Sequence, residues 1–300
     1  MTIPPPFPFI VGSGRSGTTL VRTMLDSHPD LAIPGESHFI PKMTHLKGFL
    51  DVVFTDQFAR KWGLPEPKVR VRFAATPPAT YPDAVRLLYA CYAEVQGKPR
   101  YGDKTPPYVR QLPLLADLFP EGRFVHVIRD GRDVALSLMG AGWFPGPLEE
   151  AAEYWRTAVE DGRAAGAALG ERYTELRYEA LVADPEPELR RVCGFIGLDY
   201  SPAMLDYGSS AERAIGMAVH PEDHGRLRMA PTTGLRDWRR DMDAADSGVL
   251  WLLAGRLLSE LGYTEDERGV PAAARARVVR FKALGKAQRY QRGIQRRLKR

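Results

Sequence analysis

Residues 9–20 read FIVGSGRSGTTL: an apolar run ends at Gly12, and a helix-like pattern begins at Thr18. Gly12 and Gly17 are five positions apart, which is the spacing of loops that cradle phosphate between a strand and a helix. Glycine permits positive φ, and successive backbone N–H groups together with a helix N-terminus form a concave anion site. The alternative interpretation is a glycine-rich turn in which Ser16 or Thr18 caps the helix.

This loop lacks the lysine of a Walker A motif. A Walker A loop needs Lys at the position of Thr18 to reach the β- and γ-phosphates, and Arg15 is the only cation in the loop. The sequence therefore disfavours an ordinary ATPase or kinase.

Strand-like and helix-like segments alternate along the chain, which predicts an α/β fold with a central parallel sheet flanked by helices. Strands are predicted at residues 7–11, 100–102, 124–128 and 173–176. Helices are predicted at residues 18–25, 83–95, 109–119, 133–139, 148–169, 186–196 and 247–261. The Pro-rich stretch 63–82 is interpreted as a loop or insertion, and 208–247 as a long irregular segment over the site.

Length and composition bound the class of protein. The 300 residues are 44% hydrophobic and 26% charged, which excludes a disordered, collagenous or repeat-built chain. We expect one domain over residues 1–270 and a tail over 271–300. Two cysteines, Cys91 and Cys193, are too few for a disulfide framework or a CxxC-type metal site, so a reducing, cytoplasmic compartment is expected. No apolar run approaches the roughly 18 residues of a bilayer crossing.

The loop resembles the 5′-phosphosulfate loop of sulfotransferases that use 3′-phosphoadenosine 5′-phosphosulfate (PAPS), which is a P-loop without the lysine. The resemblance is closest to the branch of the tyrosylprotein sulfotransferases and their bacterial relatives. It implies a P-loop NTPase-like, three-layer α/β/α fold. It also implies that five loop residues contact the 5′-phosphate and the sulfonate: Arg15, Ser16, Gly17, Thr18 and Thr19.

A second motif follows the third predicted strand. Residues 124–137 read FVHVIRDGRDVALS, which is similar to the family's 3′-phosphate segment and implies that Arg129 and Ser137 bind the 3′-phosphate of the nucleotide. A guanidinium at the carboxyl end of a strand and a hydroxyl two turns into the next helix suit the crevice where open α/β sheets bind ligands. Asp130 and Arg132 are interpreted as a local ion pair.

Two further segments match the family pattern. Tyr178, after the fourth predicted strand, resembles the family's tyrosine beside the adenine or ribose. Residues 226–239 resemble the late basic segment that folds back over PAPS. This resemblance favours Arg228, with Arg226 and Arg239 behind it, and the alternative for each arginine is a solvated loop.

The predicted general base lies in residues 29–41, whose spacing after the first helix matches the tyrosylprotein type. That type's general base falls on Glu36 of this sequence. Where that type has an Arg two positions later for an acidic peptide, this chain has His38. The difference weakens the case for a tyrosyl peptide and makes His38 the second candidate base. The alternative for Glu36 is a helix-capping or surface carboxylate.

The predicted leaving-group cation lies in YGDKTP, residues 101–106. The resemblance places on Lys104 the ammonium that stabilises charge on the leaving group, and a compact ammonium suits a bridging oxygen as its S–O bond breaks. The alternative is a surface pair of Asp103 with Lys104.

The resemblance implies transfer of the sulfonate group from PAPS to an acceptor hydroxyl by in-line displacement, with 3′,5′-bisphosphate adenosine as the product. A small molecule, glycolipid or carbohydrate is the expected acceptor, and a tyrosyl peptide is the alternative. No carboxylate cluster or His/Cys spacing predicts a metal site. The competing classes are a P-loop nucleotide kinase and a nucleotide-binding or membrane-scaffolding protein without catalysis, which has no need of Glu36 or Lys104.

The net charge of +5 comes from the end of the chain. Residues 275–300 hold eleven Lys and Arg and no Asp or Glu, so that 31 basic and 37 acidic residues remain in 1–274, a net charge of −6. The tail is interpreted as a basic amphipathic helix suited to an anionic membrane surface, or as a solvated tail. We expect no nucleic-acid partner, and peripheral contact with the inner face of the membrane through 275–300.

Overall fold

Strand β1 (Phe7–Gly12) lies in the interior of a four-stranded parallel sheet in the computed structural model. The strand order is β4 (Asp103–Lys104), β1, β5 (Gly122–Ile128) and β6 (Tyr173–Arg177). All six residues of β1 are buried, as expected for a parallel strand with both faces covered. The structure describes residues 5–43, 45–55, 58–217, 227 and 237–298, the last of these by backbone alone beyond residue 285.

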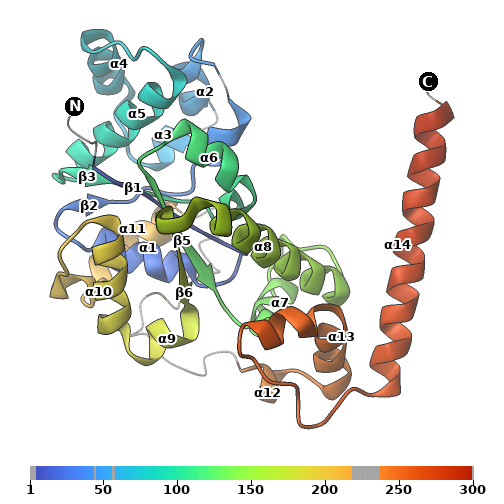
Figure 1. Ribbon diagram of the computed structural model, residues 1–300. Helices are drawn as coiled ribbons and strands as arrows, with labels where there is room; N and C mark the ends of the chain where they lie inside the picture. Colours follow the sequence, from blue (N-terminus) through green and yellow to red (C-terminus); the bar gives the residue numbers. More distant parts are fainter. Residues whose placement is uncertain (1–4, 44, 56–57, 218–226, 228–236, 299–300) are drawn as a thin grey trace. The chain divides into compact units, whose positions relative to one another are not determined.

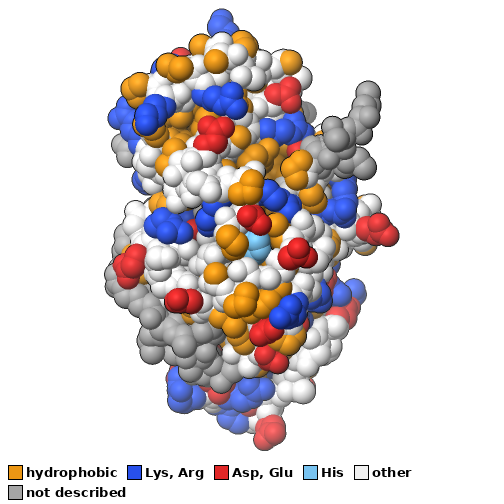
Figure 2. Space-filling model, turned by 90° about the vertical axis from the view of Figure 1, so that its left-hand side faces the viewer, with side chains coloured by type: hydrophobic (Ala, Val, Ile, Leu, Met, Phe, Trp, Pro, Cys, Tyr) orange, Lys and Arg blue, Asp and Glu red, His pale blue; other side chains and the backbone are white. Residues whose placement is uncertain are grey.

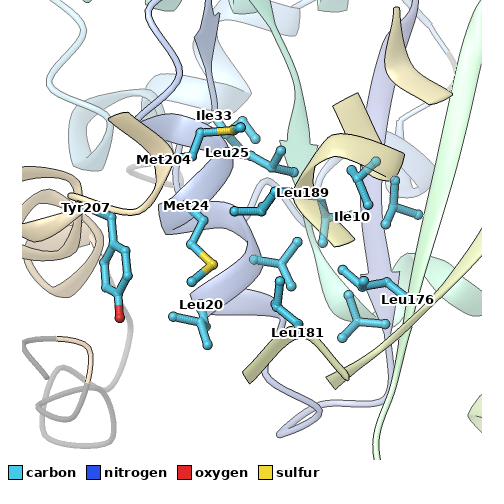
Figure 3. Packing of buried hydrophobic residues seen from close by; sticks show 14 of the residues in the cluster. Ile10, Leu20, Met24, Leu25, Ile33, Leu176, Leu181, Leu189, Met204 and Tyr207 are labelled. Carbon is cyan, nitrogen blue, oxygen red and sulfur yellow. The ribbon is translucent and has the colours of Figure 1, made fainter. Parts of the chain in front are cut away.

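One face of the sheet packs against α1 (Thr18–Asp26) and α10 (Pro185–Ile196). Ile10 of β1 and Val125 of β5 are register partners, and both belong to a buried apolar cluster on this face. Figure 3 shows Met24 of α1 and Leu189 of α10 meeting in that cluster. The spacing of the apolar residues of α1 thus places its inner stripe on the sheet.

The opposite face of the sheet is aromatic. Phe9 of β1 stacks on Phe124 of β5 with ring centroids 5.4 Å apart, and Phe119 lies 5.5 Å from Phe9. A Cβ placed on Gly162 of α8 (Leu148–Leu169) would lie 2.6 Å from the His126 ring, so α8 covers β5 closely on this face. Helices therefore lie on both faces, and the predicted three-layer α/β/α arrangement is confirmed.

The chain divides into two compact units, 1–129 with 161–233 and 130–160 with 234–300. Further elements of the first unit, several of them visible in Figure 1, are β2 (Leu31–Ala32), β3 (Arg100–Tyr101), α2 (Phe49–Thr55), α3 (Phe58–Lys61), α4 (Glu66–Ala75), α5 (Tyr81–Val95), α6 (Leu112–Leu118), α9 (Tyr178–Ala183), α11 (Gly208–Met217) and the 3₁₀ helices η1 (Ile40–Lys42), η2 (Pro106–Gln111), η3 (Gly170–Arg172) and η4 (Pro202–Met204). The second unit holds α7 (Gly131–Met139), α12 (Trp238–Asp241), α13 (Ala244–Glu260) and α14 (Ala272–Leu298). Helix α8 begins in the second unit and ends in the first. The single domain expected over residues 1–270 stays a prediction.

Most predicted elements are present with shifted ends, and two are divided. The strand predicted at 100–102 is two short strands: β3 pairs with β2 in a separate two-stranded sheet, and β4 joins the central sheet. The helix predicted at 109–119 is η2 followed by α6. Pro106 and Pro107 in the first turn and Pro113 at the junction lack N–H donors, so the ladder of hydrogen bonds is interrupted there.

Two loop predictions are wrong. The stretch 63–82 contains α4, in which Val69 and Phe73 lie one turn apart and are buried. Residues 208–247 contain α11 and the short α12, while 218–226 and 228–236 lie outside the described residues. In α4 the apolar residues Val69, Val71 and Phe73 alternate with arginines, and α11 consists mostly of small and polar residues, so neither segment has a clear helical period.

A buried arginine, Arg132, connects helices α7 and α12 of the second unit. Arg132 is 1% exposed, and its guanidinium makes two hydrogen bonds to the Asp130 carboxylate, at 3.0 and 2.8 Å. The same guanidinium lies 3.6 Å from the centre of the Trp238 ring, whose backbone N–H donates to Asp133 at 2.9 Å. The predicted ion pair is confirmed, and it is buried rather than a surface pair, fixing the start of α7 and α12.

The backbone of the tail is helical, since α14 runs from Ala272 to Leu298. Ala274 and Val278 are buried one turn apart, and a Cβ placed on Gly248 of α13 would lie 3.0 Å from Ala274. Arg277 donates to Glu149 at 3.0 Å. The first two turns of α14 are thus anchored in the second unit. Within the described part of the chain, no helix has the length and apolar character needed to cross a bilayer.

Charged side chains on the surface are mixed in sign. Figure 2 shows acidic and basic groups interspersed over the face that it displays. Exposed pairs of this kind, for example Arg190 with Glu186 at 2.6 Å, contribute at most about 1 kcal/mol each.

Candidate active site

The loop between β1 and α1 requires its glycines. Gly12 and Gly17 have φ of +157° and +89°, a range that side chains disfavour. A Cβ on Gly12 would lie 2.6 Å from the carbonyl oxygen of Val127, and one on Gly17 would lie 2.2 Å from the Tyr178 ring. Arg15 also has positive φ, at 71°. The backbone is therefore tightly folded against β5 and Tyr178, as expected for a loop that presents its N–H groups to a ligand.

The N-terminus of α1 is available to an anion. Gly17 occupies the N-cap position and has no side chain that could accept a hydrogen bond from the first turn. Ser16 Oγ is buried and has no hydrogen-bond partner among the described residues. The alternative in which Ser16 or Thr18 caps the helix is therefore wrong. A helix N-terminus and a buried hydroxyl without a partner suit a phosphate or sulfonate oxygen.

Lys104, Glu36 and Thr19 meet beside this loop. Lys104 Nζ lies 2.6 Å from Glu36 Oε1 and 3.4 Å from Thr19 Oγ1. Lys104 ends β4, Thr19 lies in the first turn of α1, and Glu36 lies in the loop after β2. Because parallel strands end at the same edge of the sheet, side chains far apart in sequence converge there. Three residues that the sequence comparison singled out are thus brought together.

The Glu36 carboxylate has a partner on each oxygen. Glu36 Oε2 lies 2.8 Å from His38 Nε2, while Oε1 bonds to Lys104. Burial acts to raise the pKa of Glu36, but the Lys104 ammonium and the hydrogen bonds from His38 and Lys104 override it and hold that pKa well below its usual range. His38 has φ of +51°, an unusual backbone conformation for a residue with a side chain. Glu36 is therefore ionised in this arrangement, and it becomes a stronger proton acceptor when Lys104 or His38 moves away.

Two alternative interpretations are wrong: a surface pair of Lys104 with Asp103, and a helix-capping or solvated Glu36. Lys104 is 4% exposed and Asp103 is fully buried, so they form no surface pair. Neighbouring residues of a strand point to opposite sides, which separates the two side chains. Glu36 is neither a helix cap nor a freely solvated carboxylate, because it forms an ion pair with Lys104 and a hydrogen bond with His38.

Arg129 follows β5 at the carboxyl edge of the sheet and is 9% exposed. Its guanidinium lies 4.5 Å from the centre of the Tyr178 ring, which also contacts Gly17. Tyr178 begins α9 directly after β6. Two predicted nucleotide residues, Arg129 and Tyr178, therefore lie next to the glycine loop.

The remaining predicted nucleotide residues belong to the second unit or lie outside the described residues, and their roles stay predictions. Ser137 is a buried residue of α7 in the second unit. Arg239 is an exposed residue of the second unit near Asp237, at 3.7 Å. Arg228 and Arg226 lie outside the described residues, so their predicted contacts with the nucleotide stay predictions.

Sequence reasoning missed a buried cluster of hydroxyls behind Glu36 and Lys104. Asp103 accepts hydrogen bonds from Tyr89 at 2.6 Å and from Ser37 at 2.9 Å. Asp103 and Ser37 are direct neighbours of Lys104 and Glu36 in sequence. The signal available in the sequence was the alternation of side chains along β4. Where Lys104 faces the site, its neighbour Asp103 points to the opposite side, into the interior.

This arrangement combines three chemical capabilities. An ionised carboxylate is a candidate proton acceptor, a buried ammonium can stabilise a developing negative charge, and the helix N-terminus can hold an anion. Among the described residues, no group of three or more His, Cys, Asp or Glu side chains is arranged to hold a metal ion. The chemistry that fits is transfer of an anionic group to a nucleophile that must lose a proton.

Comparisons with known proteins agree with this site. Protein-tyrosine sulfotransferase 1 of Danio rerio is 27% identical over 221 residues, which are 71% of this chain and 59% of that protein. Protein-tyrosine sulfotransferase A of Caenorhabditis elegans is 25% identical over 275 residues, 86% of this chain and 67% of that protein. The chain thus spans between about half and two thirds of the length of such relatives.

Solved structures show the same fold. The sulfotransferase domain from the curacin biosynthetic pathway aligns with a TM-score of 0.62 at 21% identity, covering 88% of this chain and all of that domain. The sulfotransferase domain of the Synechococcus PCC 7002 olefin synthase aligns with a TM-score of 0.57 at 23% identity, covering 88% of this chain and 97% of that domain. The sulfotransferase family model matches residues 6–202, a span that includes the glycine loop, Glu36, Lys104 and Arg129. With two thirds of its residues matched and its site assembled at the expected edge of the sheet, the chain belongs to the sulfotransferase family.

Proposed function

We propose that the protein transfers the sulfonate group of PAPS to a hydroxyl of an acceptor. The observation that carries the proposal is the contact of Lys104 with both Glu36 and Thr19, beside an uncapped helix N-terminus. A nucleotide kinase of the Walker A type has a lysine in the loop itself, whereas here the lysine reaches the loop from β4. A carboxylate placed beside that lysine also disfavours a protein that only binds nucleotide.

In the proposed reaction the acceptor oxygen attacks sulfur while the bond from sulfur to the bridging phosphate oxygen breaks. The acceptor proton passes to the Glu36 carboxylate, and the Lys104 ammonium meets the negative charge that develops on the bridging oxygen. Backbone N–H groups of the loop, with Ser16, hold the 5′-phosphate. As Lys104 turns toward the leaving oxygen, it frees Glu36 Oε1 to take the proton. The products are 3′,5′-bisphosphate adenosine and a sulfate ester.

The proposed acceptor is a hydroxyl of a small molecule, a glycolipid or a carbohydrate. His38 supports this choice, because the tyrosylprotein type has an arginine for acidic peptides at that position. A tyrosyl peptide is the second candidate, favoured by the names of the curated relatives. Transfer of ³⁵S from labelled PAPS to a tyrosyl peptide flanked by acidic residues, compared with transfer into a lipid and small-molecule extract, separates the two. Label in the peptide alone would contradict the first choice.

Nucleotide choice is tested by thermal unfolding. We expect 3′,5′-bisphosphate adenosine at 100 times its Kd to stabilise the protein by about 2.7 kcal/mol, and ADP with Mg²⁺ to have a much smaller effect.

Arg129→Ala should weaken binding of the bisphosphate by about 10- to 100-fold, because it removes a charge-assisted hydrogen bond. Arg256→Ala, at a side chain 92% exposed on α13, removes the same charge and should leave the shift unchanged. Stabilisation by ADP with Mg²⁺ alone would refute the proposal.

We also propose a cytoplasmic location and peripheral membrane contact through the basic tail. Residues 286–300 carry seven of its cations: Lys286, Arg289, Arg292, Arg296, Arg297, Lys299 and Arg300. Each basic residue near an anionic surface contributes about 1 kcal/mol. Deleting residues 286–300 retains the anchors Ala274 and Arg277, and should abolish co-sedimentation with vesicles containing phosphatidylserine. Wild-type protein should not bind vesicles of phosphatidylcholine alone. Equal binding of the deleted and full-length chains to the anionic vesicles would exclude the tail as the contact.

A further inference from the structure

A buried carboxylate lies directly behind the candidate catalytic residues. Asp103 is fully buried, and its Oδ2 accepts hydrogen bonds from Tyr89 (2.6 Å), Ser37 (2.9 Å) and Thr105 (3.2 Å). Its other oxygen, Oδ1, has no hydrogen-bond partner among the described residues. The carboxylate is therefore bonded to hydroxyls alone, without the cation that usually accompanies a buried charge.

The hydrogen bonds around Asp103 can all be completed by an ionised carboxylate. Ser37 N–H donates to Thr105 Oγ1 at 3.0 Å, so the Thr105 hydroxyl proton can point to Asp103 Oδ2 at 3.2 Å or to Ser37 Oγ, also 3.2 Å away. Ile40 N–H donates to Tyr108 Oη at 3.1 Å, and Tyr108 lies 2.8 Å from Ser37 Oγ. If Tyr108 donates to Ser37, and Ser37 to Asp103, every hydroxyl proton has an acceptor. A proton on Oδ1 has no acceptor among the described residues, and a proton on Oδ2 has to take the place of one of the three donors, so protonation of Asp103 rearranges the cluster.

The cluster ties together the two segments that carry Glu36 and Lys104. Ser37 follows Glu36 in sequence, while Asp103 and Thr105 stand on either side of Lys104. Ser37 bonds to both of these neighbours. Glu36 and Lys104 lie 2.6 Å apart on the side that faces the site. On the buried side, hydrogen bonds between their sequence neighbours hold the same two segments together.

We propose that Asp103, as a carboxylate, is the positioning residue that sets Glu36 against Lys104 for sulfonate transfer. The inference rests on the proposed function, and it assigns to Asp103 no contact with substrate. Asp103 acts through Ser37 and Thr105, whose hydrogen bonds it completes. Its own burial makes this role dependent on pH.

Burial raises the pKa of Asp103 to about 6, although hydrogen bonds from Tyr89, Ser37 and Thr105 and the nearby His38 act to lower it. The titratable groups around it are Tyr89 from α5, Tyr108 from η2 and His38 from the loop, with Lys104 and Glu36 on the front of the site. Below pH 6 the protonated form predominates and the cluster loses its acceptor. The kcat of the wild-type enzyme should therefore fall as the pH falls through about 6.

Stability should respond in the opposite direction. A carboxyl whose pKa is higher in the folded than in the unfolded chain binds more protons when folded, so its contribution to stability is lost as the pH rises from about 4 to about 6. The form of Asp103 that supports catalysis is thus the form that the fold disfavours. A positioning residue should make kcat rise over the pH range in which stability falls, whereas a purely structural residue should change stability alone.

The test compares Asp103→Asn and Ser37→Ala with wild type. Release of 3′,5′-bisphosphate adenosine from PAPS is measured with p-nitrophenol or water as the acceptor from pH 5 to 9. We expect Asp103→Asn to lower kcat at pH 8 about 100-fold, as a misplacement of about 1 Å can, while the Kd for 3′,5′-bisphosphate adenosine changes less than about threefold. The acidic decline of kcat near pH 6, called the limb here, should disappear in Asp103→Asn. It should persist in Ser37→Ala, at a lower kcat. Tyr173→Phe, which removes the hydrogen bond of 2.6 Å between Tyr173 of β6 and His126 of β5, outside the Asp103 cluster, is the matched control and should keep the wild-type kcat and its decline near pH 6.

Asp103→Asn with kcat within about twofold of wild type, or with an unchanged limb near pH 6, would overturn the inference. So would a loss of nucleotide binding as large as the loss of kcat, because Asp103 would then hold the fold rather than the geometry. Absence of PAPS turnover by wild type at every pH would instead contradict the proposed function. In that case ¹³C NMR of the aspartate carboxyls still tests the ionisation of Asp103. A signal that titrates near pH 6 and is absent from Asp103→Asn supports the inference, and the lack of one overturns it.

Discussion

Replacing Glu36 by Gln is expected to lower kcat by about 10³-fold while the Kd for 3′,5′-bisphosphate adenosine stays near that of wild type. The amide retains the size of the side chain but cannot accept the acceptor proton. It also ends the ion pair with Lys104, at 2.6 Å, and changes the contact with His38, at 2.8 Å. In the proposed complex the loop and Arg129 hold the nucleotide, so its binding should be preserved. Single-turnover release of 3′,5′-bisphosphate adenosine and calorimetric titration measure the two quantities separately.

Two comparison variants sharpen this prediction. His38→Asn removes the second candidate base and should cost less than Glu36→Gln, because His38 reaches the site through Glu36 Oε2. Glu186→Gln, on the exposed surface of α10, removes the same charge without touching the site and should retain full activity. Should Glu36→Gln keep most of its turnover while His38→Asn loses it, the imidazole would be the base.

Replacing Lys104 by Met is expected to lower kcat by about 10²- to 10³-fold, since the charge on the leaving oxygen then lacks its ammonium. The same change should alter the pH profile. Burial acts to raise the pKa of Glu36, and Lys104 is the foremost group that opposes it. Without Lys104 the pKa of Glu36 should rise. In the Asp103→Asn background, which lacks the decline near pH 6, adding Lys104→Met should therefore move the acidic decline of the activity to higher pH. Rates from pH 5 to 9 in Asp103→Asn and in the double variant test the direction.

Lys98 provides the matched control for this variant. It is also a mostly buried lysine, 14% exposed, but its ammonium bonds to the backbone carbonyls of Asp26 and Leu31. Lys98→Met should lower the melting temperature and leave kcat and its pH profile near wild type. A profile that moved equally in the two variants would show that loss of a buried lysine, rather than loss of the Glu36 partner, is responsible.

Local sequence patterns were sufficient for the loop and for strands β1, β5 and β6, but they missed β2 and the division of residues 100–104 into β3 and β4. Gly12 and Gly17 are required by positive φ and by close contacts, which are local properties that spacing reveals. The resemblance then identified Glu36 and Lys104, which are 68 residues apart and lie in contact. Composition and periodicity alone would not have paired them.

The parts that sequence did not reveal depend on tertiary contacts. Helix α4 has only two buried apolar residues, Val69 and Phe73, so its periodicity is too weak to distinguish it from a loop. The hydroxyl cluster joins Ser37, Tyr89 and Asp103 from three segments, and isolated serines and tyrosines carry no spacing signal. A buried aspartate with hydroxyl partners becomes visible only when the chain has folded.

The stacking of Tyr178 has a consequence for redesign of the nucleotide site. Its ring leaves no room for a Cβ on Gly17 and lies under the guanidinium of Arg129. A substitution at any one of the three positions therefore changes the surroundings of the other two, and their effects should not add. Libraries intended to alter the donor nucleotide need to vary these three positions together, since a scan of single positions would discard combinations that succeed only jointly.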